Sequence, residues 1–593
     1  MDKQESASSS TTNMSTSNNV AADYSQQINL VSELLCISNN PTTGSLSCCV
    51  LQQESTKYDS SNGNENDNDN DNDEGRGILA PKVLSYDSFG QCLILHKEWL
   101  QNTIQNFTTR IRSENKNKNT NTNDDDDDIV VAYISNNSPD MLLSVLACTS
   151  PTLRPTIPAL LNTRWTPAEM ISSLKSTTDN INNRRRRQIY TIILHDNSTL
   201  LENAARHVSN GLMGMGMYNQ HNTCCLSIPI FSHTYMTSYT SPYPSISYPK
   251  STDTDSGTSS SSSIILQRRM QNYQEKANKN DAIILFTSGT TGGSKGVRLG
   301  DRALLVQALA KNYEPCGYST ATAMLATTVP LFHVGGLSSF ISVLLAKGRL
   351  IFPARGEYTA TTSTSSITNR SFQVQDISKS LQDIILPANT LVVVPAMLAS
   401  FFSVNNKIRH KQQQFFKTRL ILIGGQSAGD KILQQTRQTF PNARIVQTYA
   451  CTEAASSLTF LSLNSSSGSS NGTEPIAGDC VGIPPSHIQL RIYPRTSSPQ
   501  NATAVAATTV LEPILKPYEL GLIATKGHHV MNGYWQRGKK YYTTTSQWFV
   551  SNDLGFWDEQ GRLYFGGRAK DVIRTGGETV LSQEVERVIQ LVC

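Results

Sequence analysis

Short runs of β-branched and aliphatic residues recur along the chain, and stretches with helical spacing of apolar positions fall between several of them. The short runs predict buried strands, and they cover residues 128–135, 188–195, 282–286, 322–331, 348–352, 390–396 and 418–425. Helical patterns cover residues 138–148, 301–313 and 429–440, each beginning near a serine or aspartate that can cap a helix. Alternating strands and helices predict an α/β fold with layered, mostly parallel sheets.

Polar low-complexity tracts interrupt this pattern at residues 62–74, 115–128, 251–263, 360–371 and 464–473. Such tracts cannot bury enough apolar surface to offset the entropy lost on ordering, so we expect surface loops expanded inside one fold. A basic tract at 182–188, "NNRRRRQ", is typical of a nuclear signal or a phosphate patch, but one isolated tetrad favours a solvated loop.

Length and composition narrow the class of protein. A chain of 593 residues exceeds a single compact core, and 51 basic against 47 acidic residues give no reason to expect a nucleic-acid partner. None of the 11 cysteines forms a C-x-x-C pair, which indicates reduced thiols of an intracellular protein. No apolar run reaches the length of a membrane span, about 18 residues, and the polar N-terminus lacks the apolar region of a signal peptide.

The stretch "ILFTSGTTGGSKGVRL" at 284–299 joins an apolar strand to a turn rich in glycine and hydroxyl groups. It is not a Walker P-loop, because Ser294 precedes Lys295 where a glycine is required and Gly296 follows where a hydroxyl is required. Its glycines still let backbone N–H groups approach an anion, and Lys295 adds a charge. A flexible linker is the alternative, but linkers rarely follow a buried strand in this frame.

Four further stretches share this character of strand followed by turn, and each carries residues suited to binding. They are "VPLFHVGGLSSF" (329–340), "LILIGGQSAG" (420–429), "QTYACTEAASS" (447–457) and the segment 548–589, which contains Asp553 and Arg568. In this order and at these separations, the stretches resemble the adenylate-forming superfamily of acyl-CoA synthetases, luciferases and peptide-synthetase adenylation domains. The resemblance runs from about residue 128 to the C-terminus.

The resemblance implies ATP, Mg²⁺ and coenzyme A as ligands, and an acyl-AMP intermediate that a thiol then attacks. The loop residues Thr287, Ser288, Gly289, Thr290, Thr291, Gly292 and Lys295 would bind the β- and γ-phosphates as pyrophosphate leaves. Glu453 would hold Mg²⁺ and Thr452 the α-phosphate. The nucleoside would contact Tyr449, Ala450, Gly424, Gly425, Gln426, Asp553 and Arg568, while Lys570 would be a hinge and Arg574 would meet the coenzyme A arm.

Two positions depart from the family pattern. The turn before Asp553 reads Ser551-Asn552 where Thr-Gly is usual, and Ala450 replaces a glycine after Tyr449. Neither change removes a functional group.

The wording of the motifs is most similar to plant-type o-succinylbenzoate–CoA ligases of phylloquinone and menaquinone synthesis. That similarity implies a small aromatic dicarboxylic acid as substrate, with His333, Gly335, Ser338 and Ser339 around it. The two serines and the histidine either donate to the unreacted carboxylate or only shape the wall of the site. A short- or medium-chain fatty acyl-CoA synthetase, and a non-catalytic nucleotide-binding relative, are the alternatives.

The resemblance also implies a domain plan: a disordered tail at 1–25, an adenylation domain at 26–567, and at 568–593 the start of a small C-terminal α+β domain. Because family members continue beyond this point with a lysine that reaches the α-phosphate, we expect slow adenylation and little thioester formation from these 593 residues alone. Plastid, peroxisome and cytoplasm are not distinguished by the sequence, and no oligomeric state is indicated.

Overall fold

A computed structural model describes the main part of the chain. The described residues are 28–38, 48–52, 82–116, 128–153, 156–175, 189–196, 198–213, 223–229, 237–238, 259–277, 279–287, 294–353, 374–383, 387–408, 413–426, 428–463, 479–495, 513–514, 516–535, 547–575, 578–582, 585 and 589. The expected N-terminal tail, the basic tract at 182–188, most of the low-complexity tracts and Ser288–Gly292 of the glycine-rich loop lie outside these residues. One tract differs from expectation, because residues 259–263 open a helix instead of a loop.

A seven-stranded sheet forms one layer, in the order β19-β9-β8-β4-β3-β5-β6. Its members are β3 (Asp128–Ile134), β4 (Thr156–Leu160), β5 (Ile189–His195), β6 (Thr223–Ser227), β8 (Asp281–Thr287), β9 (Lys295–Gly300) and β19 (Gly533–Tyr534). The five strands from β8 to β6 run parallel, whereas β9 and β19 are added antiparallel at one edge.

A nine-stranded sheet forms a second layer, in the order β15-β14-β13-β12-β10-β11-β1-β2-β7. Its members are β1 (Cys48–Gln52), β2 (Lys82–Ser85), β7 (Thr237–Ser238), β10 (Ala323–Leu325), β11 (Arg349–Phe352), β12 (Thr390–Val393), β13 (Leu420–Ile423), β14 (Arg444–Cys451) and β15 (Ser456–Ser462). The run from β14 to β1 is parallel, so the predicted α/β fold with layered, mostly parallel sheets is confirmed.

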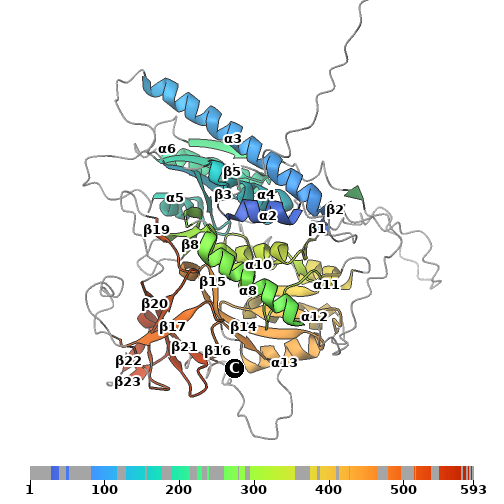
Figure 1. Ribbon diagram of the computed structural model, residues 1–593, viewed down its shortest axis with the longest axis vertical. Helices are drawn as coiled ribbons and strands as arrows, with labels where there is room; N and C mark the ends of the chain where they lie inside the picture. Colours follow the sequence, from blue (N-terminus) through green and yellow to red (C-terminus); the bar gives the residue numbers. More distant parts are fainter. Residues whose placement is uncertain are drawn as a thin grey trace, which may run out of the picture.

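A third sheet was not predicted. It has five antiparallel strands in the order β16-β21-β20-β18-β17, and it lies at the lower left of Figure 1. The strands are β16 (Cys480–Gly482), β17 (Gln489–Tyr493), β18 (Gly521–Lys526), β20 (Phe549–Trp557) and β21 (Leu563–Arg568), with a separate hairpin of β22 (Ile573–Thr575) and β23 (Glu578–Val580) beyond them.

Helices pack around and between the sheets (Figure 1). They are α2 (Leu30–Ser38), α3 (Tyr86–Lys116), α4 (Pro139–Cys148), α5 (Pro167–Lys175), α6 (Thr199–Met213), α8 (Ser259–Lys276), α9 (Asp301–Ala310), α10 (Val334–Leu345), α11 (Val374–Gln382), α12 (Pro395–Ile408) and α13 (Asp430–Thr439), with 3₁₀ turns η2 (Pro151–Leu153), η3 (Thr452–Ala454) and η5 (Ala569–Asp571). Every residue of α4 and α9 is buried, so these two helices belong to the core. Among the described residues, no helix is both long and apolar enough to cross a membrane.

The predicted helix caps are right for only one helix. Ser138 caps α4, with its hydroxyl accepting from the Met141 N–H over 3.1 Å. The caps of α9 and α13 are Gly300 and Gly429, which have no side chain to bond. Asp301 is instead buried in the first turn of α9, where a carboxylate oxygen accepts from the Leu30 N–H over 3.1 Å. A polar residue expected to start one helix therefore holds the start of another.

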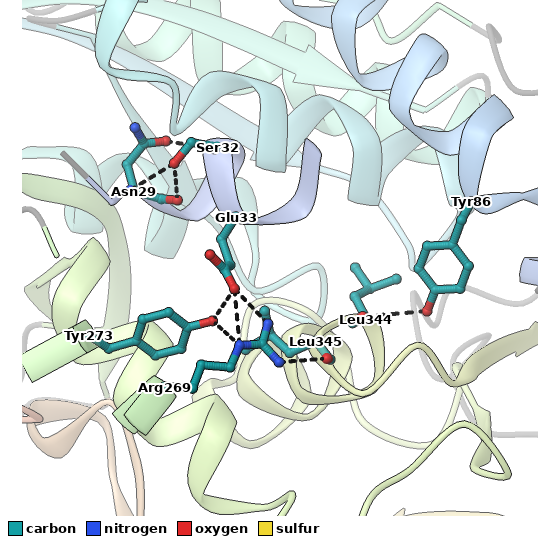
Figure 2. A network of polar contacts seen from close by, with 8 residues as sticks. All are labelled: Asn29, Ser32, Glu33, Tyr86, Arg269, Tyr273, Leu344 and Leu345. Atoms are coloured by element: carbon teal, nitrogen blue, oxygen red, sulfur yellow. Dashed lines mark hydrogen bonds and ion pairs between the residues drawn. The ribbon is translucent and has the colours of Figure 1, made fainter. Parts of the chain in front are cut away.

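Figure 2 shows a second set of contacts that holds α2 in place, centred on Glu33. Glu33 accepts hydrogen bonds from Arg269 Nη2 over 2.6 Å and from the Tyr273 hydroxyl over 2.5 Å. Arg269 also donates to the carbonyl of Leu345 over 3.1 Å, so one guanidinium connects α2, α8 and the last turn of α10. Because these side chains are at least three-quarters buried, the ion pair joins segments distant in the sequence with little screening by water.

The strand predicted over 322–331 is limited to Ala323–Leu325. The chain after it turns, and the side chain of Asn137 holds that turn: its amide donates to the carbonyls of Ala326 and Val329, and its oxygen accepts from Leu331 N over 2.9 Å. The turn delivers His333 to the start of α10.

Candidate functional site

The turns after β13 and β14 lie at the same edge of the nine-stranded sheet, because these strands are parallel neighbours. Gly424 and Gly425 follow β13, and Gly425 has a φ of 82°, a left-handed conformation that favours glycine. Gln426 is exposed beside them. Thr452 and Glu453 form η3 directly after β14. The structure therefore brings together two of the predicted binding stretches.

Glu453 is held by contacts on both its side chain and its backbone. The Tyr534 hydroxyl donates to Glu453 Oε1 over 2.9 Å, and the Met531 N–H donates to the Glu453 carbonyl over 2.8 Å. Burial raises the pKa of Glu453, and the bond from Tyr534 opposes that rise. No ion pair to this carboxylate occurs among the described residues, so its charge is available to a ligand.

These features fit a Mg²⁺ ion bound through phosphate oxygens. Magnesium prefers oxygen ligands and is commonly held by one or two carboxylates together with substrate phosphates. Within the described ranges, no cluster of three or more His, Cys, Asp or Glu side chains could hold a metal by itself. A single partly buried carboxylate without an ion-pair partner among the described residues, such as Glu453, suits the shared kind of site.

The end of the glycine-rich loop at β9 lies near this carboxylate. Thr287 and Lys295 are directly opposite each other across the β8–β9 pair, so they flank the loop 288–294. The ammonium of Lys295 lies 5.3 Å from the centre of the Tyr534 ring, in cation–π range. Tyr534 thus touches both the predicted metal ligand and the predicted phosphate lysine.

Tyr449, on β14 of the nine-stranded sheet, and Asp553, on β20 of the antiparallel sheet, form a second group. The Tyr449 hydroxyl donates to Asp553 Oδ2 over 2.8 Å, and its ring lies 5.4 Å from that of Phe565. Arg568 is paired with Asp553 across β20 and β21, at 3.9 Å from the carboxylate. Burial raises the pKa of Asp553, while Tyr449 and Arg568 act in the opposite direction. The predicted adenine and ribose residues are therefore in contact with each other.

Ser551 and Asn552, which replace the usual Thr-Gly before Asp553, still support that aspartate through Ser551. Its hydroxyl accepts from the Asp553 N–H over 3.2 Å and donates to the Ile523 carbonyl over 2.8 Å. Asn552 is exposed. The second departure, Ala450, lies at an irregularity in the β14–β15 pairing next to Tyr449. Both changes are accommodated without displacing an acidic or aromatic group.

The start of α10 carries the residues predicted to face the acid. His333 is the N-cap residue, and part of its surface is open to solvent. The protein around the rest of its ring, together with the charge of Arg164, lowers its pKa. A side chain at Gly335 would meet no atom within 4 Å, so space is open beside it. Ser338 and Ser339 are fully buried, and both accept hydrogen bonds from Lys311. Their expected role as donors to an acid stays a prediction.

The predicted hinge and coenzyme A residues lie after the third sheet. Lys570 is exposed in η5, and the backbone of Arg574 pairs with Thr579 in the β22–β23 hairpin. The side chain of Arg574 is outside the described part of the structure. Their expected roles stay predictions.

A comparison with known protein families shows which family the chain belongs to. The model of the AMP-binding enzyme family matches residues 232–535, more than half of the 593 residues. The chain belongs to the AMP-binding enzyme family. The matched range holds the glycine-rich loop, η3, α10 and Tyr534, so the resemblance deduced from the motifs is confirmed.

Members of this family resemble the chain to different degrees. A chloroplastic/peroxisomal 2-succinylbenzoate–CoA ligase of Arabidopsis thaliana is 32% identical over 327 residues, covering 53% of this chain and 51% of its own. A 2-succinylbenzoate–CoA ligase of Enterococcus faecalis is 27% identical over 333 residues, covering 56% and 59%. The chain thus matches between half and three-fifths of the length of these relatives.

The fold is that of solved AMP-binding enzymes. The o-succinylbenzoate coenzyme A synthetase of Bacillus subtilis, in complex with AMP, superposes with a TM-score of 0.58 at 17% identity and covers 95% of this chain and 84% of its own. At this identity the likeness concerns the fold alone.

Three residues of this family member were missed by sequence reasoning. Tyr534 contacts Glu453, Gln307 donates to the carbonyl of Ala454 over 2.7 Å, and Lys311 reaches the serines of α10. Tyr534 lies in the segment "NGYW", which has an aromatic after a glycine but no charge to indicate chemistry. Gln307 lies on α9, which has the pattern of a buried core helix, and Lys311 directly follows that helix. No local pattern indicates the partners of these three side chains.

Proposed function

We propose that this protein is an ATP- and Mg²⁺-dependent acid–CoA ligase, acting on o-succinylbenzoate by way of an acyl-adenylate. The observation that carries the proposal is the contact of Tyr534 with both Glu453 and Lys295, which holds a partly buried carboxylate beside the base of a glycine-rich loop in an AMP-binding enzyme. The choice of acid is supported by similarity to 2-succinylbenzoate–CoA ligases from three genera.

The first half-reaction joins the acid to AMP. A carboxylate oxygen of the acid attacks the α-phosphorus of ATP, the bond to the β-phosphate oxygen breaks, and pyrophosphate leaves with the electron pair. Mg²⁺ would neutralise charge on the phosphate oxygens. Glu453 would hold that ion, and Lys295 would place a positive charge near the leaving pyrophosphate.

The nucleoside would bind at the third sheet. Asp553 would accept hydrogen bonds from the ribose hydroxyls, and Arg568 lies next to it across the two strands. Tyr449 contacts Asp553 and would present its ring to the adenine. A buried, hydrogen-bonded carboxylate is suited to this role because it is already oriented before the ligand arrives.

The second half-reaction transfers the acyl group to coenzyme A. The thiolate sulfur attacks the acyl carbon, the bond to the phosphate oxygen breaks, AMP leaves with the electron pair, and the thiol proton passes to solvent. Adenylation is needed because a carboxylate is a poor electrophile and AMP leaves far more readily than oxide. Chloroplast or peroxisome is the proposed location, by analogy with the Arabidopsis relative.

A panel of acids tests the proposal. Acid-dependent exchange of labelled pyrophosphate into ATP is measured with o-succinylbenzoate, malonate, octanoate, benzoate and a coumarate, each with Mg²⁺. We expect the highest kcat/KM with o-succinylbenzoate. A preference for octanoate would show that the substrate is a fatty acid and not o-succinylbenzoate. Absence of exchange with every acid would favour a nucleotide-binding protein without turnover.

A further inference from the structure

Lys311 is a buried amine for which the described residues provide no carboxylate partner. It follows α9, is 1% exposed, and donates to Ser338 Oγ over 2.5 Å and to Ser339 Oγ over 3.0 Å. Burial lowers the pKa of Lys311 to about 7, because the charged form loses its water, and the Cys316 thiol acts in the opposite direction. With a pKa of about 7 the amine is only partly protonated at neutral pH, and a carboxylate bound nearby would favour its charged form.

The hydrogen bonds around Lys311 lead to the exposed end of α10. An ammonium group can only donate, so the oxygens of Ser338 and Ser339 accept from it. The proton of Ser339 goes to the carbonyl of Gly335 over 2.7 Å, in the first turn of the helix. The positive charge of Lys311 is thereby connected to the turn that carries Gly335.

The same turn is open on its outer side. No atom lies within 4 Å of a side chain placed at Gly335, and His333 caps the helix without a side-chain hydrogen bond to the backbone. The first N–H groups of a helix lack acceptors within the helix, and its dipole is positive at this end. A buried ammonium behind an open helix start creates a positive potential that favours a carboxylate.

Lys311 also connects this turn to the nucleotide side of the protein. Ser338 Oγ lies 2.6 Å from Ser456 Oγ, at the first residue of β15. Ser456 is three residues from Glu453 in the sequence. The buried polar contacts thus run from the helix predicted to face the acid to the first residue of β15, the strand that follows the turn predicted to hold Mg²⁺.

We propose that Lys311 determines which acid the protein selects: acting through Ser338 and Ser339, its charge favours an acid that brings a second carboxylate to the first turn of α10. Because it acts through the two serines, Lys311 is a positioning residue. The inference rests on the proposed function and adds to it the origin of the preference for a dicarboxylic acid.

The test compares two acids that differ by one carboxylate. The variant Lys311→Met removes the charge and nearly keeps the volume. We measure kcat/KM in pyrophosphate exchange with o-succinylbenzoate and with 4-oxo-4-phenylbutanoate, which lacks the carboxylate on the ring. The ratio of the two values should fall at least about tenfold, the factor that 1.4 kcal/mol represents, while the Kd for ATP stays within about twofold of the wild-type value.

Controls separate specificity from stability. Tyr273→Phe breaks a buried hydrogen bond beside the other end of α10, and it should lower the melting temperature and leave the ratio unchanged. Ser339→Ala breaks the connection between Lys311 and Gly335 and should lower the ratio in the same direction. If Lys311→Met does not fold, the ratio of Ser339→Ala decides: a lowered ratio supports the inference and an unchanged ratio refutes it.

An equal loss with the two acids in folded Lys311→Met would show that the lysine is only structural, and it would leave the proposed function standing. Failure of the wild-type protein to exchange pyrophosphate with any acid would instead refute the proposed function, and this inference with it.

Discussion

Replacing Tyr534 by phenylalanine removes one hydroxyl and should slow adenylation strongly. The hydroxyl donates to the partly buried carboxylate of Glu453 over 2.9 Å, and hydrogen bonds to charged groups contribute about 1.5–3 kcal/mol. Loss of that bond lets the carboxylate of Glu453 move away from the position in which it would hold Mg²⁺. Since 1.4 kcal/mol is tenfold, we expect pyrophosphate exchange to fall by about one to two orders of magnitude.

The assay is a double-mutant cycle measured by pyrophosphate exchange at saturating ATP. Glu453→Gln removes the charge to which Tyr534 donates, so Tyr534→Phe should change the rate by less than about threefold in that background. The concentration of Mg²⁺ for half-maximal binding of ATP, followed by calorimetry, should rise in Tyr534→Phe alone. Additive effects of the two substitutions, within about 0.5 kcal/mol, would refute the idea that Tyr534 acts through Glu453.

Three further predictions concern binding, stability and pH. Asp553→Ala should weaken ATP binding about tenfold or more by calorimetry, and Asn552→Ala, at an exposed neighbour, should not. Glu33→Gln should lower the free energy of unfolding in urea by about 1–3 kcal/mol, because the partly buried Arg269 loses its anion; a loss below about 0.5 kcal/mol would mean that the pair in Figure 2 contributes little. Burial lowers the pKa of His487 from 6.5 to about 4, so the unfolded chain binds the proton first, and stability should fall by up to about 3 kcal/mol between pH 6.5 and pH 4. Much of that loss should disappear in His487→Asn, and an unchanged pH dependence of urea unfolding would contradict the assignment.

The elements that could be predicted from the sequence are those with a strong local pattern. The run at 188–195 became β5 and the run at 128–135 became β3, because fully buried parallel strands are apolar along their whole length. The same reasoning overextended the strand at 322–331, since the apolar residues near Leu331 pack inside a turn held by Asn137, which lies 194 residues away. The antiparallel third sheet was missed because its half-exposed strands alternate more weakly.

The candidate site was predicted where a motif carries its own functional groups. Glu453, Asp553 and Lys295 are charged residues in distinctive turns, and the structure gives each a defined setting near the others. Tyr534 and Lys311 could not be predicted, because their importance comes from partners 81 and 27 residues away in the sequence. Tyr534 fits the pattern of β19, and Lys311 directly follows α9, where a lysine is an ordinary residue at the end of a helix.

Following one labelled oxygen atom tests most directly the claim that the protein forms an acyl-adenylate. The protein is incubated with ATP, Mg²⁺, hydroxylamine as a trapping nucleophile, and o-succinylbenzoate labelled with ¹⁸O in its carboxylates. An acyl-adenylate carries one labelled oxygen between carbon and phosphorus, and attack on carbon leaves it on AMP. We predict by mass spectrometry one ¹⁸O in the AMP formed, together with the hydroxamate of the acid. Unlabelled AMP, or ADP and phosphate as the products, would contradict an acyl-adenylate mechanism.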